Sequence, residues 1–551
     1  MTRVLVIGAG GVFGSRLAKG LVRDGFEVVV AGRSLARAEA TKVVVGAASA
    51  VALDTRDLTA ADLIATGAGI VVDAAGPFQN AEPRVARAAI AAGMHYVDLA
   101  DARDFVSGFG VLDAAARAAG VTALTGASST PALSNAALDD LTRGWTRIDK
   151  VEAAISPGAR APRGRSVTEA ILSWLGRPVR VFEGGVWTER TGWGEVVSRD
   201  FGPAGRRRLS LCETPDLDVL AERFRPTDRA LFMAGLEPGF AHWGAWLLAR
   251  LVRLTGADVR NLADSIIFFS RLAGPFGSDK GAMRVEATGR DAEGRAVRAV
   301  WLLIAPPGVG PVTPGLPALA AVKAIAAGRL KPGARACVGE LSLGEIEAEL
   351  TQHGIATGTT VEPSSLFARA IGPAFDTVPA PIRALHETTG RSVWRGLASV
   401  DGPANPLAGL VAWAFGFPRA GEGVPVELVI DAQGDQSVWR RRIGGRRFLS
   451  RLSLPRWGPR EHGRVIESFG PFSFDLTLSP EGGRLIYRNK GWRLLGVPIA
   501  TALGPTTVTH EKVESEGRFA FDVEIGLPMA GRMVRYRGWL EASERGVDHR
   551  R

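Results

Sequence analysis

The sequence predicts an α/β fold: a parallel, doubly wound sheet with an inserted α+β region, followed by a β-rich antiparallel C-terminal domain. Strand-like and helix-like segments alternate from residue 3 to about residue 130, and a Gly-rich turn joins the first strand to the first helix. Beyond about residue 355, short alternating strands dominate. Alternation builds parallel sheets, whereas consecutive short strands build antiparallel ones. Because 551 residues exceed one hydrophobic core, we expect domains at 1–130, 131–355 and 356–545.

The first strand, residues 4–7, enters a turn that contains several glycines, and residues 15–22 continue at helical period. Such a turn lets the backbone approach a pyrophosphate and directs the helix N-terminus at it. Phe13 stands where a strict G-x-G-x-x-G requires glycine, so the spacing that fits is G-x-x-G-x-x-G. A structural tight turn is the alternative, but the strand and helix on either side favour dinucleotide binding. The expected contacts in this loop are Gly8, Gly10, Gly11, Phe13 and Gly14.

The end of the second strand, residues 27–31, indicates which dinucleotide is bound. An acidic residue here usually binds the ribose 2′-hydroxyl of NAD, whereas an arginine accommodates the 2′-phosphate of NADP. No acid lies between Val28 and Ala38, and Arg33 is followed by the hydroxyl of Ser34. The guanidinium offers several donors to phosphate oxygens. We therefore expect NADP rather than NAD, the alternative being that Arg33 is only a solvated surface residue.

The alternation continues to residue 124. Residues 43–45 and 50–53 are expected as strand and lead to Asp54, an acid placed to contact the adenine. A fourth strand at 70–74 ends in Ala75, Gly76 and Pro77, whose small side chains leave room for the nicotinamide ribose. Helices at 80–92 and 102–119 then alternate with strands at 95–99 and 121–124. This arrangement is typical of a Rossmann-type sheet, which binds its ligand at the carboxyl ends of the strands.

Five segments carry a family resemblance. In order and spacing, GAGGVFG, AGRS, DAAGPF, HYVDLAD and TGASSTPALS resemble motifs of the saccharopine-dehydrogenase-like reductases, and the likeness extends over about residues 1–350. The resemblance implies an NADP-dependent oxidoreductase that acts on a small or lipid-like substrate. It also implies that Gly8, Gly11, Gly14, Arg33, Ala75, Gly76 and Pro77 contact the cofactor. The family strand usually continues into a Gly-Glu pair, but here Leu99 is followed by Ala100 and Asp101.

The proton donor is less well indicated. A nicotinamide supplies hydride, but a carbonyl or imine acceptor also needs a proton. The Tyr-x-x-x-Lys pair of many reductases is absent, because Ala100 lies four residues after Tyr96. The candidates are Tyr96, Asp98 and Asp101 near the end of the fifth strand, His242 in a Gly-rich segment, and the serines at 128 and 129. For Asp98 the alternative is a capping role.

Residues 150–330 lose the strand–helix rhythm and predict an α+β substrate domain. We expect strands at 151–155 and 180–188, helices at 167–174 and 241–254, and a hairpin of 283–288 with 297–304 over the turn at 291–294. Helices at 316–327 and 343–350 return to complete this first module.

The C-terminal region predicts short helices at 381–386 and 407–415, and then an antiparallel meander. The expected strands are 424–431, 437–443, 446–454, 463–469, 472–478, 484–490, 507–514, 518–526 and 532–541. GPAFD, FGFP, GWRLLGVP and VRYRGWLE resemble a domain of unassigned function that accompanies such reductases in bacteria. A meander of this kind commonly encloses an apolar pocket, so binding of a hydrophobic ligand is one hypothesis and a scaffolding or dimerising role is the other.

Composition limits the partners. The net charge of +10 and the nine arginines of residues 439–464 would suit a phosphorylated ligand or peripheral contact with an anionic membrane, or are simply solvated. The series of aromatic residues that would stack on single-stranded nucleic acid is missing, so no nucleic acid is expected. Two distant cysteines suit a reducing cytoplasm, and no metal-ligand spacing, signal peptide or membrane span is recognised.

The patterns predict an NADP-dependent oxidoreductase that transfers hydride to a carbonyl, imine or activated alkene, and they leave a homodimer open. The alternative is a catalytically inactive dinucleotide sensor or lipid-binding module.

Overall fold

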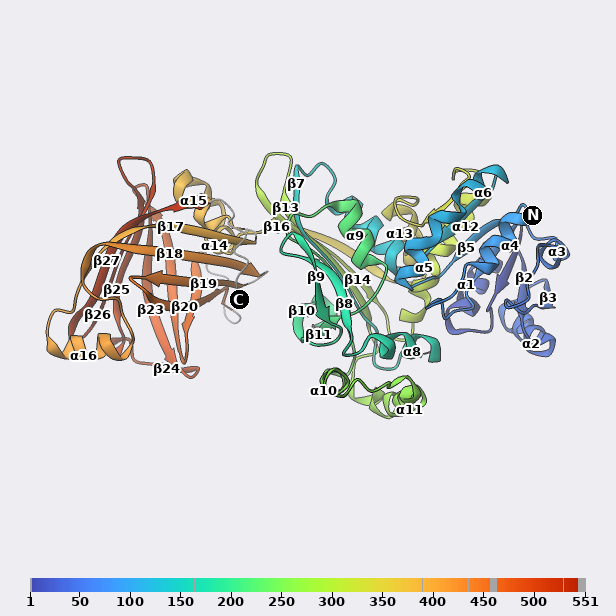
Figure 1. The fold of residues 1–551 in the computed structure, drawn as a ribbon, viewed down its shortest axis with the longest axis horizontal. Coiled ribbons are helices and arrows are strands. Elements are labelled where there is room, and N and C mark those ends of the chain that lie inside the picture. Colours follow the sequence, from blue (N-terminus) through green and yellow to red (C-terminus); the bar gives the residue numbers. More distant parts are fainter. Residues whose placement is uncertain are drawn as a thin grey trace. The chain divides into compact units, whose positions relative to one another are not determined.

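The computed structural model describes residues 2–162, 164–388, 390–433, 436–455, 463–528 and 530–543. The chain forms two compact units (Figure 1). The first comprises Met1–Ala287 and Ala299–Thr360, and the second comprises Thr288–Arg298 and Val361–Arg551. The expected fold class is confirmed in both units: a parallel sheet and a mixed sheet in the first, and a closed antiparallel sheet in the second.

The first unit begins with a seven-stranded sheet in the order β15-β6-β5-β4-β1-β2-β3, in which neighbouring strands run parallel. Strand side chains alternate between two cores: Val4 and Val6 pack on one face, and Leu5 and Ile7 on the other. All carboxyl ends therefore lie at one edge, where a ligand of such a sheet binds. The strands are β1 (Arg3–Ile7), β2 (Glu27–Gly32), β3 (Ser49–Ala52), β4 (Ile70–Asp73), β5 (His95–Asp98), β6 (Thr122–Thr125) and β15 (Gly333–Ala336).

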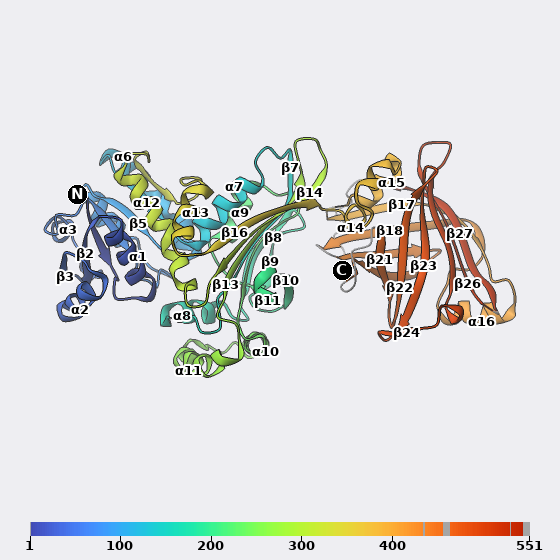
Figure 2. The same ribbon diagram turned by 180° about the vertical axis from the view of Figure 1, so that it is seen from behind.

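Helices cover both faces of this sheet (Figure 2). Leu17 and Leu21 of α1 share a core with α12, whereas Val85 of α4 and Phe105 of α5 pack on the opposite face. The helices of this part are α1 (Val12–Arg23), α2 (Leu35–Val45), α3 (Ala60–Ile64), α4 (Arg84–Ala91), α5 (Arg103–Gly108), α6 (Asp113–Ala118), α7 (Ser134–Leu141), α12 (Leu316–Ala326) and α13 (Leu343–Gln352).

A mixed sheet follows in the order β10-β11-β12-β7-β13-β14-β16, with β8 and β9 attached to β12. Its strands are β7 (Arg147–Ser156), β8 (Pro178–Glu183), β9 (Val186–Thr191), β10 (Val197–Asp200), β11 (Arg206–Leu211), β12 (Arg229–Gly235), β13 (Gly281–Arg290), β14 (Ala296–Ala305) and β16 (Ala356–Pro363). Its helices are α8 (Arg165–Trp174), α9 (Asp216–Phe224), α10 (Gly239–Thr255) and α11 (Ala263–Ala273). The predicted hairpin over residues 291–294 is confirmed, because the Asp291 N–H donates to the Arg295 carbonyl.

Three sequence predictions for this unit are wrong. Residues 43–45 end helix α2 instead of forming a strand, and Val43 and Val44 are exposed. Residues 180–188 form two strands, β8 and β9, because Gly184 and Gly185 turn the chain at positive φ. The expected helix at 102–119 is divided into α5, a 3₁₀ turn and α6.

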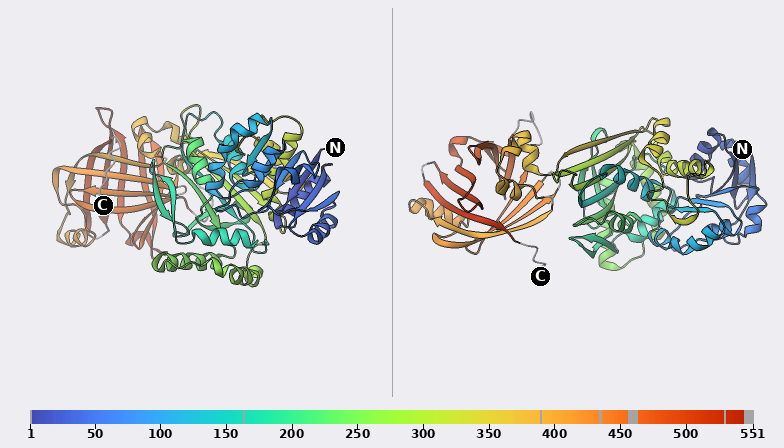
Figure 3. Two further views of the ribbon diagram at one scale, coloured as in Figure 1. Left: turned by 45° about the vertical axis from the view of Figure 1, so that its right-hand side comes forward. Right: turned by 90° about the horizontal axis from the view of Figure 1, so that it is seen from above.

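The second unit is an eleven-stranded antiparallel sheet that closes on itself, since β22 pairs with both β21 and β23 (Figure 3). Its strands are β17 (Arg391–Asp401), β18 (Gly421–Gln433), β19 (Gln436–Ile443), β20 (Arg446–Ser453), β21 (Arg464–Phe469), β22 (Phe472–Glu481), β23 (Arg484–Leu494), β24 (Val497–Ile499), β25 (Thr506–Val513), β26 (Phe519–Leu527) and β27 (Gly531–Ala542). Figure 1 shows helices α14 (Leu366–Ile371) and α15 (Ala380–His386) at one end of this barrel and α16 (Pro406–Ala414) at the other.

The nine predicted strands of this unit are confirmed, whereas β17 and β24 were not predicted. Part of the Arg-rich segment 439–464 lies outside the described residues. Among the residues that the structure describes, no helix is both long and apolar enough to cross a bilayer.

Candidate active site

The Gly-rich turn between β1 and α1 forms a backbone cradle. Gly8 has a φ of +77°, and a Cβ added there would lie 2.7 Å from the carbonyl carbon of Ala74 at the end of β4. A Cβ on Gly14 would lie 2.4 Å from the Gly8 oxygen. Gly11 precedes α1 as its N-cap and is exposed, as is Gly10. Only glycine fits at positions 8 and 14 of this turn, and the free N–H groups at the start of α1 suit a pyrophosphate.

The remaining predicted cofactor residues lie at the same edge of the sheet. Ala75, Gly76 and Pro77 follow β4, and the Ala75 N–H donates to the Asp73 carboxylate at 2.9 Å. Phe13 lies in the first turn of α1 but packs against the hydrophobic core, which favours a structural role. The Ser34 hydroxyl caps helix α2 by accepting a hydrogen bond from the Arg37 N–H at 3.5 Å, which gives this residue a structural role.

Arg33 and Asp54 meet at the ends of β2 and β3. The Asp54 carboxylate accepts hydrogen bonds from the Arg56 guanidinium at 2.6 to 3.2 Å. These bonds, the Arg56 backbone N–H and the nearby Arg33 charge lower the pKa of Asp54 to about 2. Asp54 is therefore bound to Arg56, and the charge of Arg33 is close enough to act on it. Arg56 was not predicted, although it lies two residues after Asp54.

Three candidate proton donors end or follow β5. Tyr96 is 1% exposed and stacks on Phe109 with ring centroids 6.0 Å apart. Burial and the adjacent carboxyls of Asp98 and Asp73 raise the pKa of Tyr96 well above its usual value. This phenol is packed in the core between the sheet and α5, so it is poorly placed to protonate a substrate.

Asp98 is also fully buried, and its Oδ1 holds the turn after β6. Oδ1 accepts from the Gly126 N–H at 2.7 Å, the Ala100 N–H at 2.9 Å and the Thr125 hydroxyl at 3.0 Å. Burial raises the pKa of Asp98 to about 7, and Asp73, its neighbour across the β4–β5 pairing, has a pKa raised to about 6 by burial. Asp73 and Asp98 are the last residues of two neighbouring parallel strands and lie in register. The sequence shows an acid at the end of both strands, but Asp73 was not predicted as a site residue. The contacts of Asp98 indicate a loop-positioning role.

Asp101 differs from Tyr96 and Asp98 because its residue is only partly buried and lies beyond the strand end. Its Oδ1 accepts from the Gln79 amide at 3.1 Å, and Gln79 follows the Gly76–Pro77 turn. Burial of its carboxyl raises the pKa of Asp101. Asp101 therefore combines access, a raised pKa and proximity to the predicted nicotinamide turn, the properties required of a general acid. Gln79 was not predicted.

His242 lies instead within the mixed sheet region. It is 0% exposed, its Nε2 is 2.9 Å from the Ser210 hydroxyl, and its Nδ1 accepts from the Leu236 N–H at 3.3 Å. Burial, with a contribution from Arg208, lowers the pKa of His242 to about 4. Both ring nitrogens are engaged, so the geometry favours a structural histidine. Ser128 and Ser129 are buried as well.

A buried ion network fixes α5 beside Asp101. Arg103 donates to Asp218 at 2.6 Å and to Glu213 at 3.1 Å, and its side chain is 6% exposed. These acids belong to the region of the mixed sheet, so the network ties α5 to that sheet and orients the segment that carries Asp101. Burial raises the pKa of Cys212, the neighbour of Glu213, to about 12, which excludes a reactive thiolate at neutral pH. Among the described residues, no group of three or more His, Cys, Asp or Glu is placed to hold a metal ion.

The Gly-rich turn lies within a region of known family. Residues 4–124 match the family model described as the saccharopine dehydrogenase NADP binding domain. The N-terminal region is similar to that family over these residues. The match confirms both the predicted family and the expected cofactor, NADP. Residues 378–540 match a domain of unknown function, DUF4166, which agrees with the predicted fusion.

Solved structures with dehydrogenase names are also similar to the chain. Apo histidine-tagged saccharopine dehydrogenase (L-Glu forming) from Saccharomyces cerevisiae is 17% identical, with a TM-score of 0.49, and the match covers 66% of this chain and all of that chain. A probable dehydrogenase from Thermotoga maritima is 12% identical with a TM-score of 0.32, covering 63% of this chain and 93% of that one. No curated protein matches the chain.

Proposed function

We propose that the chain is an NADP-dependent oxidoreductase that transfers hydride to a carbonyl, an imine or an activated alkene of a small or lipid-like substrate. The observation that carries this proposal is the turn of Gly8, Gly11 and Gly14, which has no room for side chains at Gly8 and Gly14 and lies within the NADP-binding domain. Bound NADPH would supply the hydride. Arg33, with Arg56 beside it, would hold the 2′-phosphate, and Ala75, Gly76 and Pro77 would line the path of the nicotinamide ribose.

Asp101 is the proposed proton donor. In carbonyl reduction, hydride adds to the carbon while the oxygen takes a proton, and Asp101 is the candidate acid that is partly accessible at the edge of the sheet. The hydrogen bond from Gln79 fixes the orientation of its carboxyl, and burial favours its protonated form. Arg103 would act as a positioning residue through its bonds to Asp218 and Glu213.

The second candidate function is a dinucleotide sensor without catalysis. The observation that favours it is that Tyr96, Asp98 and His242 are fully buried and have no free access to a substrate. Under this alternative, Asp101 would only order the loop that follows β5.

Peripheral contact with a membrane is part of the proposal. The outer side of α10 exposes Phe240, Trp243, Leu247, Leu251 and Leu254, a stripe at helical spacing. Helix α11, which follows α10 after a short connection, exposes Phe268, Phe269 and Leu272. Arg250 lies over the Trp246 ring at 5.1 Å. Apolar and aromatic residues next to arginines suit an anionic lipid surface, from which a lipid-like substrate would be reached. The two cysteines are free thiols, which supports a cytoplasmic location.

The test is oxidation of NADPH by the full chain against a panel of aldehydes, ketones, imines and enones of increasing alkyl length. We expect turnover with at least one class, and the product should carry deuterium when the cofactor is deuterated at the transferred position. Tight binding of NADPH without turnover of any member would contradict the oxidoreductase and favour the sensor.

A further inference from the structure

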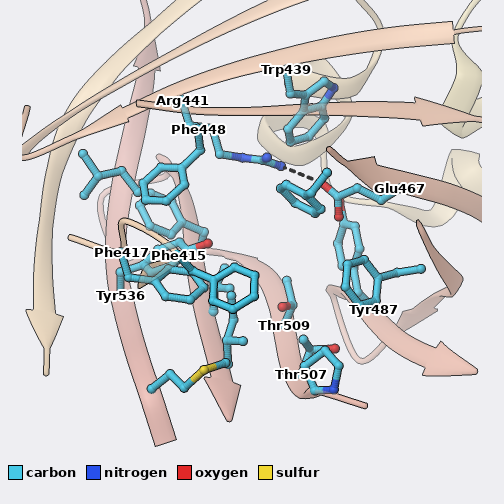
Figure 4. Close-up of a pocket in the computed structure, with 18 of the residues that line it drawn as sticks. Phe415, Phe417, Trp439, Arg441, Phe448, Glu467, Tyr487, Thr507, Thr509 and Tyr536 are labelled. Carbon is cyan, nitrogen blue, oxygen red and sulfur yellow. Dashed lines mark hydrogen bonds and ion pairs between the residues drawn. The ribbon is translucent and has the colours of Figure 1, made fainter. Parts of the chain in front are cut away.

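The barrel of the second unit encloses a cavity of about 610 Å³, and Figure 4 shows residues that line it. Its wall is dominated by apolar side chains, among them Phe417, Phe448, Phe472, Phe474, Phe519 and Phe521. The volume lies in the range of about 300 to 1,000 Å³ that is typical of small-molecule sites. This cavity lies in the region that matches the domain of unknown function DUF4166.

An ion pair faces this cavity. The Arg441 guanidinium, on β19, lies 3.3 Å from the Glu467 carboxylate on β21 (Figure 4). Arg441 also donates to the Ser450 hydroxyl at 2.8 Å and lies over the Trp439 ring at 4.8 Å. The side chains are 21% and 15% exposed, so each retains surface toward the cavity. The positive charge of Arg441 is thus compensated, yet the pair still offers a donor and an acceptor.

A second polar group on the wall is already satisfied. The Tyr487 hydroxyl donates to Glu511 Oε1 at 2.8 Å, and the other oxygen of Glu511 lies 2.6 Å from His386 Nε2. Both carboxylate oxygens of Glu511 are therefore engaged by the protein. Among the described lining residues, Arg441 and Glu467 remain the charged groups best able to receive a ligand.

The charge balance selects the ligand. A charged group buried without its own counter-ion costs free energy, whereas a neutral polar group needs only its hydrogen bonds. A carboxylate would share Arg441 with Glu467 and be repelled by it, and an ammonium would be repelled by Arg441. A hydroxyl or carbonyl can accept from Arg441, and a hydroxyl can also donate to Glu467. We propose that this cavity binds an uncharged, mainly apolar molecule that carries one hydroxyl or carbonyl group.

Helix α16 marks a route into the cavity. Phe415, directly after α16, lines the cavity and is itself 54% exposed. Leu407, Leu410 and Trp413 of the same helix are also exposed, whereas Ala408 and Ala412 pack against Met533 of the barrel. Apolar surface therefore continues from the cavity to the outside, as entry of a poorly water-soluble ligand requires.

Displacement of the neutral fluorophore Nile red from the full chain tests this proposal, with 1-decanol, decanoate, decyltrimethylammonium and decane as competitors at pH 8. We expect decanol to displace the dye at a concentration at least tenfold lower than either ion, and lower than decane. Glu467→Gln leaves the Arg441 charge uncompensated, so decanoate should gain at least tenfold while decanol changes little.

The matched control is Arg442→Met, the exposed neighbour on the same strand, which should leave all four competitors unchanged. Arg441→Met removes the donor for the ligand oxygen, so decanol should displace the dye only at a concentration at least tenfold higher. Binding of decanoate in preference to decanol by the wild-type chain would overturn the proposal, as would equal effects of Arg441→Met and Arg442→Met. Failure of Nile red to bind the wild-type chain would also overturn the proposal. The preference of the wild-type chain for decanol over the ions and decane tests the proposal even where a variant fails to fold. The NADPH affinity of each variant shows separately whether the first unit is intact.

Discussion

At the scale of single residues, the account depends on which carboxyl can deliver a proton. Asp98 and Asp101 are three residues apart, yet Asp98 binds two backbone N–H groups and a hydroxyl, whereas Asp101 binds one side-chain amide. Burial raises the pKa of both. The difference in exposure and in bonding partners, more than the pKa, is the ground on which we propose Asp101 as the proton donor.

We predict that Asp101→Asn lowers kcat for reduction by about 10²-fold, the usual contribution of a general acid. Because the active form is protonated, the wild-type rate should fall as pH rises through the raised pKa of Asp101, and the variant should lose this dependence. The measurement is a pH profile of kcat and kcat/KM with NADPH. Asp104→Asn, an exposed acid on α5, is the control. A variant that retains the wild-type profile would show that the proton comes from another group.

The sequence predicted residues whose role depends on backbone conformation better than residues whose role depends on side-chain contacts. Gly8 and Gly14 could be identified because a close approach of two backbones excludes every other residue type. Arg56 and Gln79 could not, because their roles depend on the side chains of Asp54 and Asp101 that fold onto them. The exposure of each candidate acid likewise depends on how α5 packs.

At the level of helices and strands, a run or stripe of apolar residues does not by itself show which element forms or whether it is buried. The predicted helix at 241–254 is confirmed as α10, but its apolar residues lie partly on an exposed side. Residues 43–45 suggested a strand because three valines are adjacent, yet the cap at Ser34 and the left-handed Gly46 define one helix through them. At residues 43–45 the local strand propensity yields to capping and packing.

The exposed side of α10 and α11 leads to a prediction about membranes. A Leu247→Asp, Phe269→Asp double variant should bind anionic phospholipid vesicles at least tenfold more weakly than the wild-type chain, because charge on the apolar side opposes insertion. Vesicle co-sedimentation measures this, with Val43→Asp on α2 as the control for an added surface charge. If the double variant instead splits a dimer in light scattering and leaves vesicle binding unchanged, this surface joins two copies of the chain.

At the scale of the whole molecule, the two units have separate cores. The second unit has its own hydrophobic cluster, which includes Phe367, Trp394 and Leu540, and its sheet closes without strands from the first. The predicted boundary near residue 355 remains a prediction about independent folding. The sequence could predict the change from alternation to meander. It could not predict ring closure, which depends on the pairing of the first strand, β17, with the last, β27, because β17 was not predicted as a strand.

We predict that residues 1–360 alone bind NADPH within about threefold of the full chain, because every proposed cofactor contact lies before residue 78. Isothermal titration of both proteins measures this, with circular dichroism to establish that the shorter one is folded. A folded fragment that has lost the cofactor would place part of the site in the second unit.

We propose that the cradle of the first unit selects NADP through Arg33. The decisive measurement is titration of NADPH and NADH against the wild-type chain and Arg33→Ala. We predict that NADPH binds at least tenfold more tightly than NADH, and that the variant loses most of this advantage while NADH affinity stays the same, since the lost bonds are those to a 2′-phosphate. Equal or tighter binding of NADH by the wild-type chain, or an undiminished preference in the variant, would contradict the account.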